Sequence, residues 1–100
     1  MVQATTPTFV LTLPETVDLT QAQNLYFTMK QGCVTVQKET ADLTVDGQTV
    51  SVYLTQSETL QFGVGNASLQ LNWTYPDGSR ACTNIVTIIV DPNLLKDVVE

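Results

Sequence analysis

The chain has 100 residues, enough for one hydrophobic core and not for two, so we expect a single domain. Ten carboxylates oppose four Lys and Arg residues, and a net charge of −6 with so few cations argues against binding to nucleic-acid phosphates or to anionic membranes. No apolar run approaches the roughly 18 residues of a membrane span. The N-terminus lacks the features of a signal peptide, so we expect the protein to stay in the compartment where it is made; the alternative is that a signal has been removed, and Met1 favours the first.

The first third of the chain alternates apolar and polar residues, which is the pattern of half-buried β-strands. The run "TFVLTL" at 8–13 is bracketed by prolines, which suits an edge strand. The runs "NLYFTMKQG" at 24–32 and "CVTVQKE" at 33–39 repeat the alternation on either side of Gly32. Together they predict a hairpin, or one strand interrupted at Gly32.

Three further runs continue this pattern. The run "ADLTVDGQTVSVYLT" at 41–55 contains Asp46-Gly47, the strongest short-range signal for a hairpin turn. The run "ASLQLNWTY" at 67–75 ends before the turn sequence Pro-Asp-Gly-Ser. The return strand, "RACTNIVTIIV" at 80–90, is apolar at nearly every position of its end. We therefore expect this strand to be central in its sheet and covered on both faces.

Strands at a spacing of roughly 8–12 residues, with almost no helix, predict an all-β fold. We expect an immunoglobulin-like β-sandwich of about seven antiparallel strands over residues 1–90, with a short C-terminal tail over residues 91–100. A small Greek-key barrel is the alternative. The expected core consists of apolar residues that alternate inward along the runs: Leu25, Phe27, Val52, Leu54, Leu60, Phe62, Leu71, Trp73, Ile85 and Ile89.

The tail "DPNLLKDVVE" carries four apolar residues, Leu94, Leu95, Val98 and Val99, which fall on one face of a short amphipathic turn of helix. The Asp-Pro pair at 91–92 ends the preceding strand. So short a segment does not hold a helix alone in water. We therefore expect these four residues to bind a neighbouring subunit, and folding back onto the sandwich is the alternative.

The stretch "LTQSETLQFGVG" at 54–65 is too polar for a core strand and too apolar for a plain loop. Thr55 can cap one helical turn while Glu58, three residues on, reaches back to its amide, which is the arrangement of a capping box. Leu60 and Phe62 would then point into the core. The stretch therefore reads as a crossover between the two sheets.

The same stretch opens the half of the chain that resembles a known family. The pattern consists of a strand, Leu-Thr-Gln-x-x-Thr-Leu-x-Phe, a strand with Gln and Trp, an Asp-Gly turn, Thr-x-Ile and a Leu-rich end. Its residues are Leu54, Thr55, Gln56, Thr59, Leu60, Phe62, Gly65, Gln70, Trp73, Asp77, Gly78, Thr83, Ile85 and Leu95. It resembles small structural proteins of tailed phages and prophages of Gram-positive bacteria, and also the immunoglobulin-like N-terminal domains of phage baseplate upper proteins. The resemblance implies assembly through protein–protein contacts.

Catalytic and metal-binding patterns are weak. The sequence contains no histidine, which removes a His general base, a Ser-His-Asp triad and His metal ligands. Asp42, Asp46, Asp77 and Asp91 are best explained as turn formers. EF-hand spacing is absent, although a calcium site within a single loop stays open. We therefore predict no enzyme activity, no cofactor and no metal site.

Two pairs of residues have both a structural and a functional interpretation. Trp73 and Tyr75 share one strand face and would form a sugar-stacking platform if exposed, but we expect them to belong to the core. Cys33 and Cys82 could form an intersheet disulfide in an oxidising compartment. Because no export signal is present, we expect reduced, half-buried thiols.

The leading functional hypothesis is a non-catalytic structural or assembly module of a phage or prophage particle. Its partners would be other phage structural proteins or a second copy of itself, first in the host cytoplasm during assembly and then in the virion. The alternative is a sugar- or surface-binding immunoglobulin-like module of a bacterial cell-surface protein. An enzyme is the least favoured class.

Overall fold

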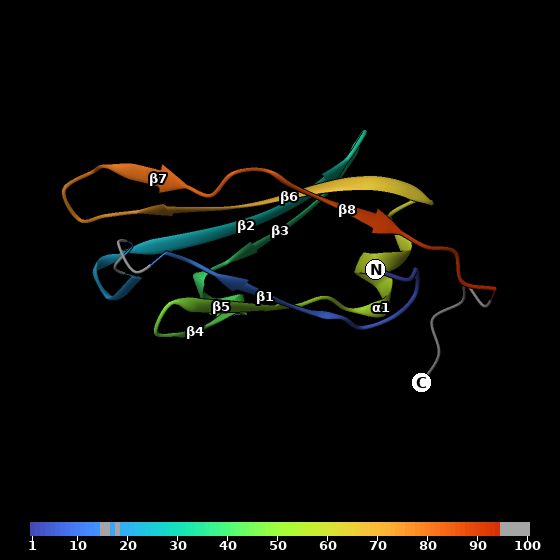
Figure 1. Ribbon diagram of the computed structural model, residues 1–100, viewed down its shortest axis with the longest axis horizontal. Helices are drawn as coiled ribbons and strands as arrows, with labels where there is room; N and C mark the ends of the chain where they lie inside the picture. The colour runs from blue at the N-terminus through green and yellow to red at the C-terminus, as the bar shows by residue number, and fades with distance from the viewer. Residues whose placement is uncertain (15–16, 18, 95–100) are drawn as a thin grey trace.

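A computed structural model of the protein describes residues 1–14, 17 and 19–94. The fold is all-β, with two antiparallel sheets that lie one above the other (Figure 1). The first sheet has the order β1 (Thr8–Thr12), β5 (Thr49–Tyr53) and β4 (Leu43–Asp46). The second has the order β3 (Val34–Glu39), β2 (Asn24–Gln31) and β6 (Gly65–Thr74), followed by β7 (Arg80–Cys82) and β8 (Val86–Val90), which both pair with β6.

The predicted hairpins are confirmed. Strands β2 and β3 pair antiparallel across a turn at Gly32, and β4 and β5 pair across a turn at Gly47. The two glycines have φ angles of 55° and 60°. Left-handed backbone of this kind strains residues that carry a Cβ atom, so glycine is the favoured residue at both turns.

Short helical segments carry the chain from one sheet to the other. They are η1 (Leu19–Gln21) before β2, η2 (Thr40–Asp42) before β4, and α1 (Gln56–Leu60) before β6. The predicted capping box is confirmed at α1, where the Glu58 amide donates to Thr55 Oγ1 over 3.2 Å and the Thr55 amide donates to Glu58 Oε1 over 2.9 Å. The stretch at 54–65 is therefore a capped crossover between the sheets.

A salt bridge fixes α1 to the second sheet. Lys38 Nζ on β3 lies 2.7 Å from Glu58 Oε2 and donates to Glu58 Oε1 over 2.8 Å. Burial raises the pKa of Glu58, but hydrogen bonds from Lys38 and Thr55, together with the charge of Lys38, outweigh burial and hold this pKa below its ordinary value. The Glu58 carboxylate therefore completes the cap of α1 and also links α1 to Lys38 on β3.

The inward faces of the two sheets form one core. The rings of Phe9 on β1 and Phe27 on β2 stack across the interface with centroids 6.4 Å apart. Leu60, predicted as core, is only half-buried. The confirmed core residues are Leu25, Phe27, Val52, Leu54, Phe62, Leu71 and Trp73, and the core also contains Met29, Val36, Val50 and Val90.

The structure contradicts the prediction that residues 80–90 form a central, covered strand. Strands β7 and β8 pair with β6 and end the five-stranded sheet, so they lie at its edge. Ile85 and Ile89, both predicted as core, are 66% and 63% exposed. The all-β prediction is correct, but these two residues were assigned to the wrong face.

An extra residue between β7 and β8 explains the error. Trp73 is paired with Ala81 in β7, and Leu69 is paired with Val86 in β8. Between these pairs the chain advances four positions on β6 and five on the last strand. Two antiparallel strands that advance unequally contain a β-bulge.

The bulge reverses the faces of the residues that follow it, because a shift of one residue turns every side chain to the opposite side of a sheet. Val90 is fully buried and Ile88 is half-buried against the core. Ile85 and Ile89 therefore point away from it. Uninterrupted alternation along residues 80–90 would put Ile85 and Ile89 on the same face as Ala81. The extra residue shifts the pairing by one position, so this face was predicted wrongly.

Two polar side chains complete the hydrogen bonds at the bulge. The Leu71 amide donates to Thr83 Oγ1 over 3.1 Å, and the Thr83 amide donates to the Leu71 carbonyl over 2.9 Å. Gln70 Nε2 donates to the Thr83 carbonyl over 2.8 Å. The side chains of Thr83 and Gln70 thus replace regular ladder contacts that the extra residue displaces.

Candidate functional site

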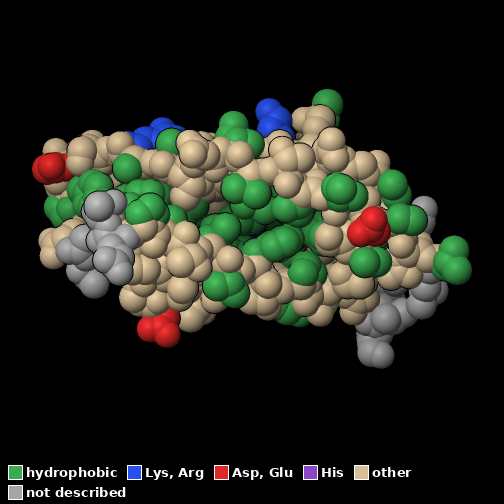
Figure 2. Space-filling model, in the orientation of Figure 1, with side chains coloured by type: hydrophobic (Ala, Val, Ile, Leu, Met, Phe, Trp, Pro, Cys, Tyr) green, Lys and Arg blue, Asp and Glu red, His purple; other side chains and the backbone are tan. Residues whose placement is uncertain are grey.

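The core is incompletely covered along one edge of the molecule. Strand β1 ends the first sheet, and β7 and β8 end the second. Figure 2 shows hydrophobic side chains gathered in a band between the two layers on this face. We call this band the edge seam, and define it by core-facing residues of the edge strands that are only partly covered: Phe9, Leu11, Ala81, Val86 and Ile88.

One end of the edge seam is hollowed. The hollow has a volume of about 410 Å³ and lies between the end of β1 and the segment from β7 to the bulge. Leu13, Pro14 and Val17, which follow β1, line it on one side. Ala81 lines it from β7, and Trp73 lies on its core-facing wall. Its size is within the range of about 300–1,000 Å³ typical of ligand pockets. We call it the edge hollow.

The N-terminal residues cover the opposite end of the edge seam. Val2 forms a parallel bridge with Asp91, and the Met1 amino group donates to the Ile89 carbonyl over 2.9 Å. Gln3 is buried, and its Nε2 donates to the Phe62 carbonyl over 2.7 Å. The first three residues thus run beside the end of β8, while the edge hollow lies at the β7 end.

The bulged edge strand also exposes apolar side chains. Ile85 and Ile89 are 66% and 63% exposed, and Val86 is 44% exposed although it belongs to the core-facing row. An edge strand that presents both unpaired backbone and apolar side chains is a site where another chain can add. The edge seam, on the inner side of this strand, and Ile85 and Ile89, on its outer side, together form the candidate docking surface.

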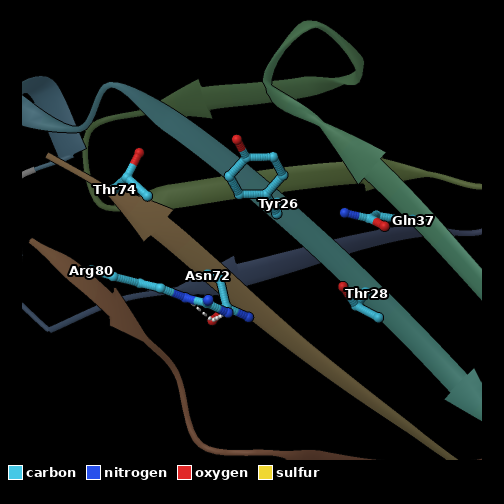
Figure 3. Close-up of a pocket in the computed structure, with 6 residues that line it drawn as sticks. All are labelled: Tyr26, Thr28, Gln37, Asn72, Thr74 and Arg80. Atoms are coloured by element: carbon cyan, nitrogen blue, oxygen red, sulfur yellow. Dashed lines mark hydrogen bonds between the residues drawn. The ribbon is translucent and has the colours of Figure 1, made fainter. Parts of the chain in front are cut away.

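A second candidate site lies on the outer face of the five-stranded sheet. Six side chains line a shallow groove of about 400 Å³, and all lie on the same side of the sheet (Figure 3). They come from four neighbouring strands: Tyr26 and Thr28 on β2, Gln37 on β3, Asn72 and Thr74 on β6, and Arg80 on β7. Hydroxyl, amide and guanidinium groups therefore surround one tyrosine ring.

Arg80 is held in place in this groove by Asn72. Its Nη2 and Nε donate to Asn72 Oδ1 over 3.0 Å and 3.3 Å. Within the described residues, the one salt bridge joins Lys38 to Glu58, so Arg80 has no carboxylate partner there. The groove thus offers a fixed cation and several hydrogen-bonding side chains to a polar ligand.

The predicted tail residues are only partly placed. Leu94 lies just beyond the last strand and is fully exposed. Before it, Asn93 Nδ2 donates to the Gln3 carbonyl over 2.9 Å, so the tail leaves the domain at the covered end of the edge seam. Leu95, Val98 and Val99 lie outside the described residues, and partner binding by this tail stays a prediction.

Trp73 belongs to the core as predicted, with an exposed fraction of 3%. Its Nε1 donates to the Tyr75 hydroxyl over 2.9 Å, and Tyr75 is partly buried against the same core. The two rings therefore do not form an exposed sugar-stacking platform. The tyrosine that does face the outer groove is Tyr26.

The predicted turn role of Asp77 is confirmed. Asp77 Oδ1 accepts hydrogen bonds from the Ser79 hydroxyl over 2.6 Å and from the Ser79 amide over 2.8 Å, and these bonds hold the pKa of Asp77 below its ordinary value. Asp42 accepts from the Glu39 amide at η2. Within the described part of the chain, no group of three or more Cys, Asp and Glu side chains is placed to bind a metal ion.

The two cysteines are unpaired and exposed, which corrects the expectation of half-buried thiols. Cys33 lies in the turn between β2 and β3, and Cys82 lies at the end of β7 in the same sheet, so an intersheet disulfide does not form. Each lies on the outside because it sits at a turn or on an edge strand. Cys82 also lines the edge hollow.

Sequence patterns did not identify the outer groove. Its residues lie on separate runs, and only the register of β2, β3, β6 and β7 brings them together. The available signal was the row of polar residues that alternates with the core row on each strand, as Tyr26 and Thr28 do with Phe27. The edge hollow likewise depends on which strands end the two sheets.

Comparison of the chain with protein-family models, with curated proteins and with solved structures found no match. Among the described residues, none of the helices is long and apolar enough to cross a membrane. The function is therefore inferred from the two surfaces, the edge seam with its hollow and the outer groove.

Proposed function

We propose that this protein is an immunoglobulin-like β-sandwich that acts as a non-catalytic assembly module of a phage or prophage particle. It docks onto other structural proteins of the particle, or onto a second copy of itself, during assembly in the host cytoplasm and remains in the virion. The observation that carries this proposal is the edge seam with its exposed neighbours Ile85 and Ile89. Exposed apolar surface of this kind on an edge strand marks a site of protein association.

The strand order supports the immunoglobulin-like part of the proposal. Immunoglobulin domains place strands B, E and D in one sheet, and C, F and G in the other, with C′ added beside C in some classes. The order β1-β5-β4 corresponds to B-E-D, and the order β3-β2-β6-β8 corresponds to C′-C-F-G. Residues 1–3, parallel to the end of β8, occupy the place of a short first strand.

The residues that resemble phage structural proteins support the assembly role through their positions. Gln70 and Thr83 make the hydrogen bonds of the bulge, and the bulge turns Ile85 outward. Thr55 caps the crossover helix, and Phe62 anchors that crossover in the core. The resembling half of the chain thus builds the edge strand on which the proposed docking surface lies.

The particle itself provides the direct test. Particles released from the native host after prophage induction are purified by density gradient, and their proteins are quantified by mass spectrometry. We expect this protein to co-purify at a constant ratio to the major capsid protein, whereas an abundant cytosolic host protein of similar size is depleted. If this protein is depleted to the same degree as that control, the proposed role is wrong.

A matched pair of variants tests the docking surface. Ile89→Asp places a charge on the exposed edge strand, and Thr44→Asp places one at an exposed residue on β4, at the other edge of the molecule. Both variants should fold, because both side chains are exposed and point away from the core. We expect Ile89→Asp to lower incorporation into particles and Thr44→Asp to leave it unchanged; equal incorporation of both would contradict docking through the edge strand.

The outer groove favours a second candidate function, the binding of a surface sugar. Tyr26 offers a ring face, and Arg80, Asn72 and Gln37 offer donors and acceptors around it. Titration with purified cell-wall saccharides should then give saturable binding that Tyr26→Ala and Arg80→Ala each weaken. Tyr53→Ala, a half-exposed tyrosine on β5 in the other sheet, is the control. Absence of binding by the unchanged protein would remove this candidate.

A further inference from the structure

We infer that the edge hollow binds the C-terminal segment, residues 94–99, of a second copy of this chain. The inference rests on the proposed docking role and names both the partner and the receiving site. Its ligand is a short apolar peptide segment, in which Leu94, Leu95, Val98 and Val99 supply the side chains that enter. Its site is the part of the edge seam that the N-terminal residues leave open.

The chemistry of the edge hollow suits this ligand. Leu13, Pro14, Val17 and Ala81 give it apolar walls, and Trp73 connects it to the core. The rest of its lining consists of Thr12, Cys82, Thr83 and Asn84. Apolar side chains that fill such a space remove both their own surface and the surface of the walls from water. A segment whose apolar residues gather on one face provides this contact.

The first two apolar residues of the tail, Leu94 and Leu95, cannot reach the hollow of their own chain. From Asp91 back to Thr83, which lines the hollow, the strand covers eight residues at about 3.3 Å each, or roughly 26 Å. Leu94, three residues beyond Asp91, reaches at most about 11 Å from it. Leu94 is also fully exposed in the structure, so its own chain does not cover it.

The N-terminus further obstructs the tail's own route. Residues 1–3 already lie beside the end of β8, where the Gln3 amide donates to the Asp91 carbonyl over 3.0 Å. A tail that folded back along β8 would have to displace these residues. Leu94 and Leu95 can therefore fill such a hollow only on another molecule.

A second copy of the chain can supply this hollow if the two copies are related by a two-fold axis. The tail leaves at one end of the edge seam, beside Gln3, and the edge hollow lies at the other end, beside Ala81. When two copies place their edges side by side in opposite directions, a two-fold axis brings each tail opposite the hollow of the other. Such an interface uses the same surface on both subunits, which is the usual geometry of a homodimer.

The first test is the mass of the full-length protein in solution by analytical ultracentrifugation. We expect a dimer, and expect the mass to halve when residues 94–100 are deleted. That deletion keeps Asn93 and every hydrogen bond described above. A full-length variant with Leu94, Leu95, Val98 and Val99 all changed to Ser should also be monomeric. A monomeric full-length protein, or a truncated protein that stays dimeric, would overturn the inference.

The two cysteines provide a matched test of the receiving site. A bulky maleimide on Cys82, in a Cys33→Ser variant, lies at the edge hollow, whereas the same group on Cys33, in a Cys82→Ser variant, lies on the β2–β3 turn. We expect dimerisation to be lost with the first and kept with the second.

The remaining outcomes separate this inference from the proposed function. If the full-length protein is monomeric and yet present in purified particles, the docking role stands and the tail binds a different protein. If truncation lowers the urea midpoint of a protein that is monomeric throughout, the tail packs on its own domain and the inference is wrong. If the dimer forms as described but particles lack the protein, the proposed phage role fails alone.

Discussion

The register of β8 can be tested by two neighbouring substitutions that exchange roles if the bulge is absent. Val90 is fully buried, and Ile89, one residue earlier, is 63% exposed. With the bulge, Val90→Ala creates a cavity in the core and Ile89→Ala removes mainly exposed atoms. Without the bulge, the alternation would place Ile89 in the core and Val90 in solvent.

The expected magnitudes differ enough to decide the matter. Val90→Ala removes two buried methyl groups at about 0.8 kcal/mol each, and the remaining cavity adds to this, so we expect a loss of about 2 kcal/mol. Ile89→Ala should change the free energy of unfolding by less than about 0.5 kcal/mol, as is usual for surface positions. The larger residue therefore gives the smaller effect, which is the reverse of what residue size suggests.

Urea unfolding followed by the fluorescence of Trp73, the single tryptophan, measures both changes. With a slope of about 2 kcal/mol per molar urea, the midpoint should fall by about 1 M for Val90→Ala and by less than about 0.3 M for Ile89→Ala. The slopes should stay equal to that of the unchanged protein. If Ile89→Ala destabilises the protein more than Val90→Ala, the bulge and the reasoning built on it are wrong.

Four other outcomes follow from the same structure. Thr55→Ala should lower the free energy of unfolding, measured in urea, by about 1 kcal/mol because it removes the helix cap. An unchanged free energy of unfolding would contradict the capping box. Because the pKa of Glu58 lies below 4.5 in the folded protein, its stabilising effect is complete above about pH 4.5 and is lost as pH falls through the folded pKa. Glu58→Gln should thus lose less stability on acidification, and an unchanged acid dependence would refute this. Thr83→Val should lower the free energy of unfolding by about 1–3 kcal/mol, because it leaves the Leu71 amide without the Thr83 hydroxyl as its acceptor. An unchanged free energy of unfolding would show that the bulge rearranges. Cys33 and Cys82 should both react with iodoacetamide without denaturant, and a mass gain of fewer than two alkyl groups would contradict their exposure.

Features that depend on near neighbours in the chain could be predicted from the sequence. The alternation of apolar and polar residues located the strands, because successive side chains in a strand point to opposite faces of the sheet. Asp46-Gly47 located a hairpin, and Thr55 with Glu58 located the capped crossover, since each uses only backbone groups within a few residues. The core positions of Phe27, Leu71 and Trp73 follow from the same local rule.

Features that depend on partners distant in the sequence could not be predicted in this way, because strand pairing and sheet packing set them. The bulge exists because β6 pairs with two segments in registers that differ by one residue, and no alternation within residues 80–90 reveals this. The edge position of β8 likewise depends on the order of the strands, which exposed Ile89 where its hydrophobicity predicted burial. The outer groove joins Tyr26 to Arg80, and the edge hollow joins β1 to β7, because strand pairing and sheet packing set those distances.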